Sequence, residues 1–207
     1  GGDLSLDAAG AYYVQIGSGG RNLNAGAITG TVDVAVDGDV RMSGGTSDRT
    51  YAMVGHGGAD VTTSVSASDI TLDATGSITL TAGNNQSMAQ IGHGGHQNLN
   101  FTVADSGIFI NTVAGSGQGD VRLAGGGVNS AAMIGHGGTR TNANRGSGDN
   151  SASGDIVIGQ AANLYLTAGD NVDSYAQIGH AGEGGAGVHS GAVEIHATGE
   201  IVLAGGV

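Results

Sequence analysis

The stretch Met88-Ala-Gln-Ile-Gly-His-Gly-Gly95 decides the fold, because five variants of it run along the chain. These marker phrases occupy residues 13–20, 51–58, 88–95, 131–138 and 175–182. The glycine after the aliphatic residue stands at Gly17, Gly55, Gly92, Gly135 and Gly179, so successive copies are 38, 37, 43 and 44 residues apart. Such a period is typical of solenoids, propellers and repeat arrays. We therefore expect residues 1–207 to form one repeat segment, excised from a longer array.

The composition excludes several classes of protein. There are 43 glycines but only two Phe and five Tyr among 207 residues, which leaves few large side chains for a globular core. A formal net charge of -12 leaves little to attract a polyanion, so nucleic acid is not an expected partner. No apolar run approaches about 18 residues, so we expect no membrane insertion of this segment. The chain has no cysteine, which excludes disulfides and thiolate metal sites.

Two further elements recur beside the marker phrase, and both alternate aliphatic with small or polar residues, which is typical of strands. One precedes the phrase, as in Ser77-Ile-Thr-Leu80, and the other follows it, as in Asp69-Ile-Thr-Leu72. Three strands per repeat and few aromatic residues favour a three-sided parallel β-helix over a propeller, and we expect almost no helix.

Each repeat has room for one coil with looped-out corners or for two coils of about 19 residues. The longest repeat favours one coil, because residues 139–153 contain no apolar side chain larger than alanine to build a second set of buried strands. We predict about one coil per repeat of 37–44 residues.

In this register the inward aliphatic side chains form three columns. The predicted columns are Leu4, Val40, Ile78, Val121, Leu164 and Ile201; Ile16, Val54, Ile91, Ile134 and Ile178; and Val32, Ile70, Ile108, Ile156 and Val193.

The histidines of the marker phrase also point inward, in one column with Ser18. They are His56, His93, His136 and His180. Imidazoles stacked about 4.8 Å apart do not converge tetrahedrally on zinc or nickel, so we expect a neutral ladder that satisfies backbone groups. His96, His189 and His196 lie off this column and are expected in loops or at the surface.

Acidic residues precede many of the predicted strands and raise the question of calcium. They are Asp3, Asp39, Asp120, Glu200, Asp69 and Asp155. Tandem calcium-binding nonapeptides are absent, and Ser77 and Asn163 interrupt the acidic column, so we interpret the acids as solvated turn residues. We predict no metal, cofactor or catalytic residues, because no pair of acids stands out and no lysine can serve as a base.

Units such as Gly119-Asp-Val-Arg-Leu-Ala-Gly125, alternating with the marker phrase, resemble the shaft repeats of filamentous haemagglutinin-like exoproteins of two-partner secretion, which are large bacterial adhesins. The resemblance spans the whole chain and implies a right-handed β-helix at the bacterial cell surface or outside the cell. We expect a non-catalytic shaft that gives reach and attachment to host-cell, matrix or polysaccharide ligands, with loops 21–30, 96–105 and 139–153 as contact surfaces. The alternatives are a subunit that associates end to end into an extracellular filament and, more remotely, a β-helical polysaccharide lyase or hydrolase.

Overall fold

The computed structural model describes residues 1–10, 12–24, 26–98, 101–112, 119–138, 150–182 and 187–206. All regular structure in these ranges is β-strand, and the sheets are parallel, so the predicted fold class is confirmed at this level. The described ranges contain no helix long and apolar enough to cross a membrane.

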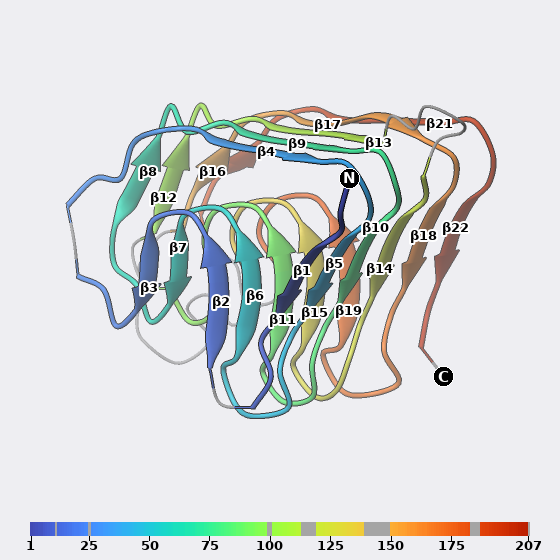
Figure 1. The fold of residues 1–207 in the computed structure, drawn as a ribbon. Coiled ribbons are helices and arrows are strands. Elements are labelled where there is room, and N and C mark those ends of the chain that lie inside the picture. The colour runs from blue at the N-terminus through green and yellow to red at the C-terminus, as the bar shows by residue number, and fades with distance from the viewer. Residues whose placement is uncertain are drawn as a thin grey trace.

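Each repeat adds one strand to each of three parallel sheets, in the register predicted from the aliphatic columns (Figure 1). Sheet 1 contains β1 (Leu4–Asp7), β5 (Val40–Ser43), β10 (Ile78–Thr81), β14 (Val121–Ala124), β18 (Leu164–Thr167) and β22 (Ile201–Ala204). Sheet 2 contains β2 (Tyr13–Ile16), β6 (Tyr51–Val54), β11 (Met88–Ile91), β15 (Ala131–Ile134) and β19 (Tyr175–Ile178). Sheet 3 contains β4 (Val32–Val36), β9 (Ile70–Ala74), β13 (Ile108–Thr112), β17 (Ile156–Ala161) and β21 (Val193–Ala197).

The main core lies between these three sheets and consists of the predicted columns. Ile78, for example, pairs with Val40 on one side and Val121 on the other, and Ile91 pairs with Val54 and Ile134. In the middle coils these side chains are fully buried. Burial of one Val, Leu or Ile stabilises a fold by about 1.5–3 kcal/mol, so the stacked columns are the main source of stability.

The segment between sheets 2 and 3 forms a side lobe, which the sequence analysis did not predict. In this lobe β3 (Gly19–Arg21) pairs with β7 (Gly57–Ala59), and a fourth parallel sheet contains β8 (Ser64–Ser66), β12 (Thr102–Ala104), β16 (Ala152–Ser153) and β20 (His189–Ser190). Figure 1 shows these strands beside sheet 2, at the left. The side lobe has its own apolar cluster, made of Val61, Val65, Phe101, Val103 and Ala152.

The side lobe corrects the expectation that residues 96–105 form an open contact loop. His96, Asn98 and Phe101 are buried, and Thr102–Ala104 pairs on both sides with neighbouring strands. The alternation of one buried and one exposed residue shows that this stretch is part of the wall of the lobe. Of the predicted loops 21–30 and 139–153, residues 25 and 139–149 lie outside the described ranges.

Candidate functional site: two side-chain ladders

The four marker histidines form a continuous stack beside the main core. Ring centroids of successive imidazoles are 4.8–5.0 Å apart, and the ring planes are within 8° of parallel. His93 and His136, in the middle of the stack, are completely buried. The spacing equals the separation of adjacent strands, so the ladder is a direct consequence of the repeat register.

Each imidazole uses both ring nitrogens to bind the preceding coil. Nδ1 accepts a backbone N–H at 2.8–3.2 Å, donated by Ser18 to His56, by His56 to His93, by His93 to His136 and by His136 to His180. Nε2 lies 2.5–2.9 Å from the carbonyl oxygens of Gly30, Ser68, Ser106 and Gly154, in the same order. A backbone N–H can only donate and a carbonyl can only accept, so Nε2 carries the proton and the rings are neutral.

Burial supports this neutral state. Removal from water lowers the pKa of His93 to about 4, with a smaller effect from the neighbouring His56. Burial, assisted by the adjacent imidazoles, also holds the pKa of His136 well below the ordinary value of 6.5. The hydrogen bonds agree with the predicted ladder, although the donors come from the histidine positions themselves rather than from the Gly-Gly turn.

The ladder also closes the main tube. The chain leaves the wall after each histidine, builds the side lobe, and returns two residues before the next strand of sheet 3, as at Ser68 and Ser106. The Nε2 bond joins the histidine at the exit to the carbonyl group at the return point of the preceding coil, as His136 does with Ser106. Changes of length inside the side lobe are therefore separated from the main core, as in the repeat that begins at Gly135, where the lobe segment is longest.

The three histidines outside the ladder differ from one another. His96 lies in a loop of the side lobe, which is one of the two predicted placements, but it is buried rather than at the surface. His189 aligns with Ala152 in the fourth sheet and is half-buried, and burial lowers its pKa. His196 is exposed, as predicted, and its Nε2 lies 2.6 Å from a carboxylate oxygen of Glu194. Among the described residues, no three His, Asp or Glu side chains are grouped to hold a metal ion.

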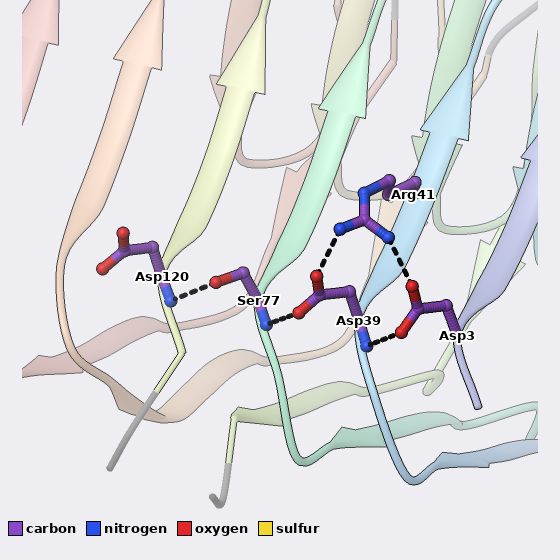
Figure 2. Close-up of polar contacts among 5 residues, drawn as sticks. All are labelled: Asp3, Asp39, Arg41, Ser77 and Asp120. Atoms are coloured by element: carbon purple, nitrogen blue, oxygen red, sulfur yellow. Dashed lines mark hydrogen bonds and ion pairs between the residues drawn. The ribbon is translucent and has the colours of Figure 1, made fainter. Parts of the chain in front are cut away.

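A second ladder runs along the turn that precedes sheet 1 (Figure 2). Asp3 accepts the backbone N–H of Asp39 at 3.0 Å, and Asp39 accepts that of Ser77 at 2.8 Å. The Ser77 hydroxyl accepts the N–H of Asp120 at 3.1 Å. Further along the column, the Asn163 side chain donates to Asp120 and accepts the N–H of Glu200, at 2.7 and 2.8 Å.

This second ladder corrects the interpretation of the turn acids as merely solvated. Ser77 and Asn163 had been read as interruptions, yet both continue the same column of hydrogen bonds. The sequence signal that was missed is a hydrogen-bond acceptor at this position in every repeat, whatever its charge. In sheet 3, Asp69 and Asp155 likewise accept the N–H groups of Gly107 and Ala192.

The second carboxylate oxygens of Asp3, Asp39 and Asp120 are paired with arginine. Arg41 bridges Asp3, at 2.8 Å, and Asp39, as Figure 2 shows, and Arg122 pairs with Asp120. The N–H of Asp39, followed by Arg41, lowers the pKa of Asp3. These bonds occupy the oxygens that a calcium ion would need, so the geometry of this turn favours cohesion between coils over metal binding.

Comparison with family models, with curated proteins and with solved structures found no match to this chain. The ladders and sheets therefore stand as the observations from which a function can be argued.

Proposed function

We propose that this chain is a rigid, non-catalytic shaft segment of a bacterial protein that is secreted or displayed on the cell surface, and that it serves reach and attachment. In this proposal the three sheets are the walls of a three-sided parallel β-helix with one coil per repeat, wound right-handed as the resemblance to filamentous haemagglutinin-like exoproteins implies. The side lobe lies on one corner of the tube.

The observation that carries the proposal is the direction of the polar contacts. The histidine ladder uses buried or partly buried side chains and the turn ladder uses more exposed ones, and both bind the neighbouring coil. The two acids that meet, Asp3 and Asp39, are joined by Arg41 rather than arranged around a free reacting group. Catalysis needs such convergence, with an acid or base within hydrogen-bond reach of one reacting group. Repetition of the same bond along an axis instead makes neighbouring coils cooperative and resists bending.

The proposed function is tested first by location. Intact cells of the producing bacterium are treated with protease, and the chain is followed with an antibody against its purified form. We expect the protease to remove the chain while a cytoplasmic marker protein survives. A chain found only inside intact cells would reject the proposal.

Attachment is tested with micrometre beads that carry the purified chain, under flow over cultured cells and over extracellular matrix. Beads with the wild-type chain should remain attached, whereas beads with the Ile134→Asp variant should not, because a charge in the second column disrupts the core. Equal retention would reject an adhesive role of the folded segment. Release of unsaturated or reducing ends from an acidic polysaccharide by the purified chain would replace the proposal with an enzyme.

A further inference from the structure

The outer face of sheet 3 carries a groove that neither ladder uses. Its volume is about 520 Å³, and it lies where β4, β9 and β13 end, before the chain turns toward sheet 1. Figure 1 shows these strand ends at the upper right, beside the start of sheet 1. Ligand pockets for small molecules and short oligomers typically measure 300–1,000 Å³, so the groove has the right size for one or two sugar units.

The lining of the groove combines an apolar floor with hydrogen-bond acceptors. Ala35, Val36 and Ala74 supply the apolar surface. Asp73 and Asn111 lie side by side in neighbouring strands, and the Asn111 amide donates to one oxygen of Asp73 at 2.8 Å. The second oxygen of Asp73 makes no hydrogen bond within the described part of the chain, and this carboxylate is exposed to solvent.

The pairing of strands β13 and β17 beside this groove shifts its register after Ile110. A bulge in β17 inserts Gly159, so that Asn111 is opposite Gln160 instead of Gly159. A Cβ at position 159 would lie closer than 3 Å to the side-chain oxygen Oδ1 of Asn111 and would displace that side chain. Glycine at the bulge therefore leaves space for the Asn111 side chain, and bulges often occur where a side chain is re-aimed.

An exposed aromatic ring extends the same face. Phe109 is two residues before Asn111 on β13, is 36 % exposed, and lies with its ring over Gly107. Its neighbours across the sheet are Thr71 and Val157. The ring lies outside the groove, and the acceptors Asp73 and Asn111 lie side by side on β9 and β13, so the outer face offers apolar and accepting surface to a ligand with C–H faces and hydroxyl groups.

We propose that this groove binds a neutral oligosaccharide. Sugar hydroxyls donate to Asp73 and Asn111, while the C–H face of the sugar covers Ala35 and Val36. The carboxylates of Asp37 and Asp73, in a chain of net charge -12, disfavour acidic saccharides and phosphates. This inference rests on the proposed attachment function and names the class of ligand that such a segment contacts.

The test is titration of the purified chain with neutral hexasaccharides of glucose, mannose and galactose, followed by calorimetry and by the NMR shifts of the Ala35 methyl group. We expect binding of at least one of them, with the shifts confined to the groove. Asp73→Ala should weaken binding at least tenfold by removing an acceptor. Ala35→Phe should weaken it as much by filling the groove while leaving the acceptors unchanged.

The matched control is Asp48→Ala, an exposed acid between β5 and β6 and away from sheet 3, which should change affinity less than twofold. Circular dichroism of each variant verifies folding. Absence of binding to all three sugars, equal binding of acidic hexasaccharides, or binding of calcium alone would overturn the inference. If beads carrying Asp73→Ala attach to cells as the wild type does, the groove is rejected while the shaft proposal remains.

Discussion

Truncation of His136 to alanine tests the claim that the histidine ladder closes the main tube. The imidazole is completely buried, accepts the N–H of His93 at 3.0 Å, and has Nε2 2.6 Å from the carbonyl oxygen of Ser106. Alanine can make neither bond, so both backbone groups lose their partner.

The expected loss follows from these contacts. Each buried backbone group left without a partner costs about 1–3 kcal/mol, so two of them destabilise the fold by about 2–6 kcal/mol. The cavity left by the ring and the loss of stacking at 4.8 and 5.0 Å act in the same direction. We expect a decrease of about 4 kcal/mol in the free energy of unfolding.

Urea denaturation, followed by far-UV circular dichroism, measures this loss, and hydrogen exchange locates it. The amide of His93 and the side-lobe strands β12 and β16 should lose protection first, because the hydrogen bond between His136 and the Ser106 carbonyl group is lost there. His196→Ala is the control, since that exposed ring should change stability by no more than about 0.5 kcal/mol. A loss below about 1 kcal/mol for His136→Ala would refute the closing role of the ladder.

Four further predictions concern the core, the ladders and the close approach of coils. Ile134→Asp should unfold several neighbouring coils together, seen as one broad loss of amide protection; a change limited to β15 would contradict the stacked columns. Because the pKa of His93 is lowered to about 4 when folded, the unfolded chain binds more protons at this residue between pH 6.5 and 4, and the His93 contribution to stability should fall by roughly 3 kcal/mol across that window and not further below it. The difference between the urea midpoints of the wild type and of His93→Gln over this pH range isolates that contribution, and equal slopes would reject it. Gly94→Ala should lower the melting temperature strongly, because φ is +125° and the new Cβ would lie closer than 3 Å to the Gly137 carbonyl oxygen. Ala181→Gly, in the same column at φ +86°, should instead stabilise the fold by about 0.5–1 kcal/mol. An unchanged melting temperature for Gly94→Ala would disprove the close approach of the coils. Asp39→Ala should destabilise more than Asp39→Asn, because an amide oxygen can still accept the Ser77 N–H as Asn163 does for Glu200, and equal losses would show that the charge matters rather than the acceptor.

The three main sheets were predictable because their signal is local and repeated. An aliphatic residue at every second position marks each strand, and copies such as Ile78 and Val121 align when the repeats are superimposed. The histidine column was predictable for the same reason, since a fixed offset of two residues from the core aliphatic determines its side of the strand.

The side lobe was not predictable in this way. Its segments differ in length between repeats, and its inward residues change from Val65 to Val103, Ala152 and His189, so no fixed spacing identifies them. The burial of His96 was not predictable, because it depends on a lobe that the repeat pattern does not encode. The groove beside Asn111 depends on a bulge in a neighbouring strand, which is equally absent from the repeat.

By itself, the sequence determined the strands, their parallel stacking and the columns of the main core, because a strict repeat makes each coil the template for the next. Only the tertiary structure decided what the polar residues do. Hydrogen bonds such as those from His136 to Ser106 and from Ser77 to Asp39 join residues 30 and 38 positions apart, and their geometry exists only after the coils are stacked. Local patterns determine which way a side chain points, whereas its partner is determined by the chain that folds against it.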